Sequence, residues 1–158
     1  MIGSTIMSAE EAVREVIGMY IESMEKSSGD MVSEAFHENA KVVGYLNGDF
    51  LQLTTADFAG FVSSQEPGNV DFEVLSCEVN GETATAKVRD KYLGISFLDS
   101  LSLINENGKW SIYNKLFHVE ALFRLEFPRR NRSHRLTANP YSPRASCPFR
   151  STVQLVDY

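Results

Sequence analysis

The sequence is poor in cysteine and has no long apolar run. Its 158 residues include only Cys77 and Cys147, which are too few for the disulfide framework of a small secreted domain. No stretch reaches the roughly 18 consecutive apolar residues of a membrane span. Residues 1–15 also lack the basic start and apolar core of a signal peptide. These absences predict a cytoplasmic protein that does not associate with a membrane.

Sequence motifs for the common metals and cofactors are absent as well. The two cysteines form no CxxC pair, and His37, His118 and His134 are too scattered for a zinc motif. There is neither a glycine-rich phosphate loop nor a GxSxG elbow. We therefore expect no metal and no cofactor, so that any catalysis would be of the acid/base type.

What the sequence does have is an uneven distribution of charge. The formal net charge is −6, but residues 1–123 hold 8 lysines and arginines against 19 acids, a net charge of −11. Residues 124–158 hold 7 arginines against 2 acids and concentrate Pro140, Pro143 and Pro148. We expect one domain over residues 1–126, followed by a basic tail over residues 127–158 that is disordered or not native. The acidic domain argues against nucleic acid as a partner.

Helix signals lie at the start of this domain. Ser8 and Glu11 form a capping box pattern ahead of a helix that runs to about Lys26. Asp30 is expected to cap a second, short helix, and Thr54 or Thr55 a third that stops before Pro67-Gly68. The apolar face of the first helix recurs at intervals of three and four residues and consists of Val13, Ile17, Tyr20, Ile21 and Met24.

Strand signals fill the rest of the domain. Asn47-Gly48, Asn80-Gly81 and Asn107-Gly108 are hairpin turn signals. Helices grouped before a run of antiparallel strands predict an α+β fold, with the helices on one face of a curved sheet. An unfilled cone of this kind can hold a ligand. We expect strands over residues 41–46, 50–53, 70–79, 82–93, 95–105 and 109–121.

Strand alternation predicts which side chains enter this cone. Asp90 and Tyr92 share a face with apolar residues of their strand, and Asp99 shares one with Phe97 and Leu101. By the same count, Asn114 and His118 share a face with Trp110 and Ile112. Burial would raise the pKa of a carboxyl group there, which makes Asp99 a candidate proton donor. The predicted ligand-binding residues are Tyr20, Asp90, Tyr92, Asp99, Asn114 and His118, with Asp99 and His118 as a catalytic acid/base pair.

Structural roles are an alternative for each of these residues. Asp90 could reach solvent or pair with Lys91 or Lys115. Asp99 could form a structural hydrogen bond to Tyr20, to Asn114 or to the backbone. His118 could lie at the rim of the cone with no role in a ligand site.

Several segments, taken together and in order, resemble the nuclear-transport-factor-2-like (NTF2-like) superfamily, in its branch called putative lumazine-binding or SnoaL-like. The resemblance covers about residues 8–120. It implies a cone-shaped, cystatin-like fold, with three N-terminal helices packed on a strongly curved, mainly antiparallel sheet, and a homodimer formed through the outer face of that sheet. The segments are Tyr20-Ile21-Glu22, residues 35–40 (AFHENA), residues 43–48 (VGYLNG), residues 99–103 (DSLSL), residues 108–112 (GKWSI) and residues 114–118 (NKLFH).

Ketosteroid-isomerase-like members of this superfamily pair a first-helix tyrosine with a protonated aspartate on a late strand as an oxyanion hole. Tyr20 and Asp99 fall at similar places here. The general base of those members would fall at about Gly44, which has no side chain, so a proton-shuttling isomerase of that type is disfavoured unless His118 or Asp90 supplies the base.

Three functions remain open from the sequence. The first is a small-molecule-binding domain with a partly polar pocket. The second is a cyclase, isomerase or dehydratase that uses Asp99 and His118 as acid and base. The third is a protein-interaction module that uses the open sheet.

Overall fold

The computed structural model describes residues 6–122. The expected boundary at residue 126 and the basic tail lie outside these residues. Within them the predicted order of elements is confirmed, with three helices and a six-stranded sheet. The elements are α1 (Ala9–Glu25), α2 (Gly29–Ala35), β1 (Phe36–Leu46), β2 (Asp49–Thr54), α3 (Thr55–Ser63), β3 (Asp71–Asn80), β4 (Thr83–Tyr92), β5 (Ile95–Glu106) and β6 (Lys109–Leu122).

Side-chain caps set the starts of all three helices. Ser8 and Glu11 form the expected capping box of α1, and Thr54 caps α3 with Asp57 as its partner. The prediction that Asp30 caps α2 is wrong, because the Ser28 hydroxyl accepts the hydrogen bond from the Met31 amide. A serine two residues earlier therefore starts this helix, and Asp30 stands in its first turn, where its charge favours the helix dipole. None of the described helices is long and apolar enough to span a membrane.

The six strands form one sheet in the order β2-β1-β6-β5-β4-β3. Every neighbouring pair is antiparallel except β1 and β6, which are parallel. Strand β1 begins at Phe36, five residues earlier than the strand predicted from Lys41, and its register against β6 shifts between these two positions. This irregular stretch lets the chain pass directly from α2 into the sheet.

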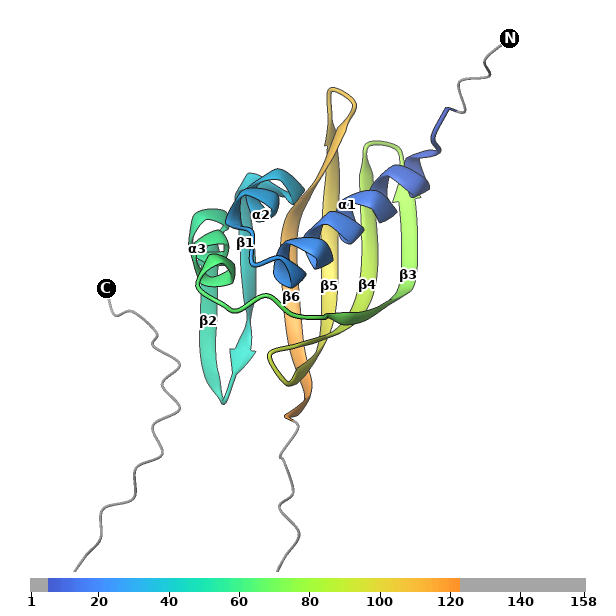
Figure 1. Cartoon of the computed structure of the whole chain (residues 1–158). Helices are drawn as coiled ribbons and strands as arrows, with labels where there is room; N and C mark the ends of the chain where they lie inside the picture. The colour runs from blue at the N-terminus through green and yellow to red at the C-terminus, as the bar shows by residue number, and fades with distance from the viewer. Residues whose placement is uncertain (1–5, 123–158) are drawn as a thin grey trace, which may run out of the picture. The chain divides into compact units, whose positions relative to one another are not determined.

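All three helices pack against one face of the sheet, which we call the inner face (Figure 1). Helix α1 crosses this face diagonally between β6 and β3, and α2 and α3 lie over β1 and β2 (Figure 1). The rings of Tyr20, Phe36 and Phe58 meet at centroid distances of 5.5 to 6.3 Å and join the helices to the sheet. The segment between α3 and β3 is tied to the end of α1, because the Gly68 amide donates to the Glu25 carbonyl at 3.0 Å.

Gly44 is a point of close approach between β1 and β6. A Cβ atom at this position would lie 2.5 Å from the Phe117 carbonyl oxygen and 2.6 Å from the Phe117 ring. The space that a side chain at Gly44 would need is therefore filled by Phe117. A general base at this position of β1, as in ketosteroid-isomerase-like proteins, is incompatible with this packing.

This contact predicts that Gly44→Ala destabilises the fold by up to about 3 kcal/mol, because the backbone carbonyl cannot move aside as a flexible side chain can. The measurement is urea unfolding followed by circular dichroism. The control is Gly60→Ala in α3, where an added Cβ meets no atom within 4 Å and alanine should stabilise the helix by about 0.5 to 1 kcal/mol. Equal stabilities for the two variants would contradict the packing argument.

Candidate functional site

A buried group of three polar side chains lies where α1 crosses the inner face. Tyr20 donates a hydrogen bond from its hydroxyl to Oδ2 of Asp99 at 2.9 Å. The Lys115 ammonium forms an ion pair with the same Oδ2 at 2.9 Å and also donates to the Tyr20 hydroxyl. We call these residues the buried triad. Tyr20 and Asp99 are fully buried and Lys115 is 5% exposed, so their charges interact through a medium of low polarity.

A β-bulge places Lys115 in this group. Ser102 of β5 pairs with Asn114, but Leu103, the next residue of β5, pairs with Ile112, so Tyr113 is an extra residue of β6. An extra residue reverses the alternation of side chains beyond it. Lys115 consequently lies opposite Leu101, a buried residue of the inner face.

The same bulge overturns the predicted positions of Asn114 and His118. Asn114 lies opposite Ser102 and His118 opposite Leu98, and both partners belong to the outer face because Asp99 points inward. His118 is exposed and Asn114 is half-buried. The expectation that both line the cone is therefore wrong, and an acid/base pair of Asp99 with His118 has no support in the geometry.

The positions predicted for Asp90 and Tyr92 agree with the structure. Alternate residues of β4 are buried from Ala84 to Tyr92, and Asp90 is only 2% exposed. With both carboxyl groups ionised, neither oxygen of Asp90 nor Oδ1 of Asp99 has a hydrogen-bond partner among the described residues, and the Tyr92 hydroxyl makes no hydrogen bond among them either. Buried polar groups without partners are rare in proteins, so this part of the inner face is unusual.

Burial is the main cause of an altered pKa at Asp90. It raises the pKa of this carboxyl group to about 8, while the Lys115 charge lowers it and the Asp99 carboxylate raises it. A hydrogen bond with Asp99 also raises it, because only a protonated Asp90 can donate to that carboxylate. Asp90 is thus a carboxyl group that stays largely protonated at neutral pH.

The two tyrosines of the site also resist ionisation. Burial raises the pKa of Tyr92 to about 12. The pKa of Tyr20 is raised further, first by burial and then by the nearby charges of Asp99 and Asp90. At neutral pH the site therefore offers protonated oxygens at Tyr20, Tyr92 and Asp90, beside the ion pair of Lys115 with Asp99.

Aromatic rings surround the lysine of the buried triad. The Lys115 nitrogen lies 4.6 Å from the ring centre of Tyr20, 5.4 Å from that of Phe58 and 5.9 Å from that of Phe97. The Phe97 ring in turn packs edge-on against Phe117. Cation–π attraction stabilises the ammonium where water is excluded.

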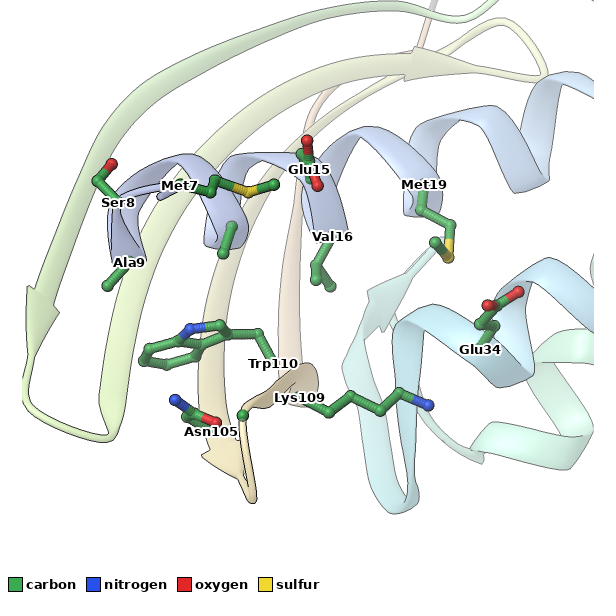
Figure 2. A pocket seen from close by; sticks show the side chains of 12 residues that line it. Met7, Ser8, Ala9, Glu15, Val16, Met19, Glu34, Asn105, Lys109 and Trp110 are labelled. Carbon is green, nitrogen blue, oxygen red and sulfur yellow. The ribbon is translucent and has the colours of Figure 1, made fainter. Parts of the chain in front are cut away.

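A groove lies against the first half of α1. This groove of about 620 Å³ runs between the first half of α1 and the β5–β6 turn, and the indole of Trp110 lies beneath the helix there (Figure 2). None of the predicted site residues lines this groove. Residues 6–122 also contain no cluster of three or more histidine, cysteine or acidic side chains that could hold a metal ion.

Sequence reasoning missed Lys115 as part of the site and named it only as a possible partner of Asp90. Strict alternation along β6 places it on the outer face. The neighbouring sequence gives no signal against this, because Leu116 and Phe117 are both apolar and either could face inward.

Comparison with known proteins identifies the family. The family model described as "Putative lumazine-binding" matches residues 8–118. The chain belongs to this family. Its fold is that of the NTF2-like superfamily, as the resemblance implied.

Three proteins illustrate what the chain is similar to. A Cladobotryum protein named aldolase FrzH is 26% identical over 117 residues, which are 72% of this chain and 94% of that protein. The structure of an NTF2-like protein of unknown function from Methylobacillus flagellatus is 28% identical, with a TM-score of 0.67 over 75% of this chain and 98% of its own. A second such protein, from Silicibacter pomeroyi, is 21% identical, with a TM-score of 0.67 over 72% of this chain and 99% of its own.

The raised pKa of Asp90 predicts a stability that falls with pH. The folded state keeps a proton that the unfolded state releases above its ordinary pKa of 3.8. Stability is therefore greatest below that value and declines, by at most about 1.4 kcal/mol per pH unit, until Asp90 ionises near pH 8. In Asp90→Asn, this contribution to the change of unfolding free energy with pH is absent.

Urea unfolding of the original protein and of Asp90→Asn at intervals from pH 5 to pH 9 measures the difference. The unfolding free energy of the original protein should fall relative to that of Asp90→Asn as the pH rises to about 8. Above pH 8 the difference between the two proteins should stay constant. Parallel curves across this range would mean that Asp90 is ionised in the folded state.

Proposed function

We propose that this protein binds a small molecule on the inner face of the sheet, beside Asp90, Tyr92 and Asp99. The observation that carries the proposal is a set of buried oxygens, both of Asp90, one of Asp99 and the Tyr92 hydroxyl, for which residues 6–122 supply no partner other than a proton shared between the two carboxyl groups. Leaving such groups unpaired costs about 1 to 3 kcal/mol each. A ligand that hydrogen-bonds to them would recover this free energy.

The chemistry of these groups limits the ligand. A protonated Asp90 and the Tyr92 hydroxyl can donate hydrogen bonds, and Oδ1 of Asp99 can accept one. The half-buried rings of Phe97 and Phe117 offer apolar surface nearby. This combination suits a compact, largely apolar molecule that carries a carbonyl group and a hydroxyl group.

A second candidate function is an enzyme that acts on such a carbonyl compound. Asp90 would be the acid, since it holds a proton at neutral pH, and Asp99 would be the base. The relative named aldolase FrzH supports an activity of this class, because the chain matches 94% of its length. No role for His118 is needed in this scheme.

Native mass spectrometry of freshly purified protein tests the binding proposal. We expect a co-purifying molecule of small mass, or capture of one from a panel of hydroxy-carbonyl compounds. In Asp90→Leu, which keeps a similar volume but removes both oxygens, affinity should fall at least about tenfold. The control is Asp49→Leu at the exposed start of β2. Equal occupancy of the two variants would show that the ligand lies elsewhere.

We further propose that the protein forms a homodimer through the outer face of the sheet. Five apolar side chains form a continuous strip there. Tyr45 pairs with Phe50 across β1 and β2, Val43 pairs with Leu116 across β1 and β6, and Leu98 lies diagonally beside Leu116. Tyr45, Phe50 and Leu116 are 63%, 60% and 49% exposed. A contiguous apolar surface of this kind is typical of an interface.

Leu116→Glu should turn such a dimer into a monomer, because it buries a charge at the centre of the strip and should raise the dimer dissociation constant about 30-fold or more. Size-exclusion chromatography with light scattering measures the change. Thr85→Glu places the same charge at an exposed outer position of β4, away from the strip, and should leave the dimer intact. A monomeric original protein at high concentration would disprove the dimer.

A further inference from the structure

Lys115 differs from the other lysines of residues 6–122 in its surroundings. Lys26, Lys41, Lys87, Lys91 and Lys109 are all exposed, whereas Lys115 is 5% exposed. A lysine without a special role keeps its ammonium in water, because burial of the charge is costly.

The arrangement around Lys115 is that of a reactive amine. Its nitrogen contacts one base, Oδ2 of Asp99, and one hydroxyl, that of Tyr20. It also lies over the faces of three aromatic rings. Its charge acts on Asp90, which supplies a carboxyl group able to donate a proton.

We propose that Lys115 forms an iminium bond with the carbonyl carbon of an aldehyde or ketone, an inference that rests on the small-molecule binding proposed above. The substrate class is a β-hydroxy carbonyl compound. An iminium withdraws electrons from the neighbouring carbon–carbon bond, which is the bond broken when such a compound is cleaved into two carbonyl compounds.

The step balances with the groups present. The Lys115 ammonium gives one proton to Asp99, and the neutral nitrogen then attacks the carbonyl carbon. The carbonyl oxygen takes a proton from Asp90, and the nitrogen, positively charged once the new C–N bond has formed, returns a proton to Asp90. Asp99 finally donates its proton to the hydroxyl group, which leaves as water as the nitrogen lone pair forms the C=N bond. One ammonium and one carbonyl compound thus give one iminium and one water, with both aspartates restored.

An ion pair with a purely structural role is the competing explanation, and borohydride trapping separates the two. The full-length protein is incubated with benzaldehyde or 4-hydroxy-2-butanone, reduced with sodium borohydride and digested, and the adducts are located by peptide mass spectrometry. We expect at least about tenfold more adduct at Lys115 than at the exposed Lys87. In Asp90→Asn, which cannot act as an acid, the Lys115 adduct should fall.

Lys115→Arg keeps a positive charge beside Asp99 and removes the reactive amine, and Lys87→Arg is its matched control. Lys115→Arg should lose the selective adduct and Lys87→Arg should keep it. The fold of each variant is checked by its cooperative thermal unfolding. If a variant does not fold, the test still stands, because adduct mapping on the original sequence locates the reactive lysine.

Thermal protection by the same two probes is measured without borohydride. Protection together with no selective adduct at Lys115 would overturn the iminium proposal and leave the binding proposal standing. If the experiment finds no protection and no selective adduct at Lys115, the iminium proposal is overturned. That result also counts against a carbonyl ligand. A selective adduct together with protection supports both.

Discussion

The ion pair of Lys115 with Asp99 is the interaction on which the inner face of the sheet depends. An aspartate that is fully buried at the centre of β5 is tolerated only where a positive charge and a hydrogen-bond donor reach it. Lys115 brings the charge from β6 and Tyr20 brings the donor from α1. Removal of one partner would leave a charge buried and unpaired, so this contact also fixes how α1 lies on the sheet.

Burial is the main cause of the raised pKa of Asp90, and one lysine that is already paired with Asp99 does not offset it. With Asp99 already paired, an ionised Asp90 would bring an uncompensated negative charge into the same low-polarity region. A proton on Asp90 avoids that charge. Because ionisation is unfavourable here, the pKa of Asp90 is raised to about 8. Burial beside this ion pair thus produces a carboxylic acid that can donate a proton at neutral pH.

The sequence predicts those parts of the fold that local interactions determine. Capping residues such as Ser8 and the Asn-Gly turns act over a few neighbours, and β4 has strict alternation, so Asp90 could be placed on the inner face. Strand β6 could not be predicted in this way, because the bulge at Tyr113 comes from pairing with β5 and from the approach of Phe117 to Gly44. This one extra residue places His118 on the outer face and Lys115 on the inner face, where Lys115 pairs with Asp99.

The bulge at Tyr113 and the glycine at position 44 depend on each other. Reversing the alternation of β6 turns Phe117 inward, and its ring then takes the space where a side chain at Gly44 would stand. A side chain at position 44 of β1 therefore has no space, and the Lys115 amine of β6 reaches the carboxylate of β5. A single extra residue in β6 thus decides which side chain of this strand faces the Asp99 carboxylate.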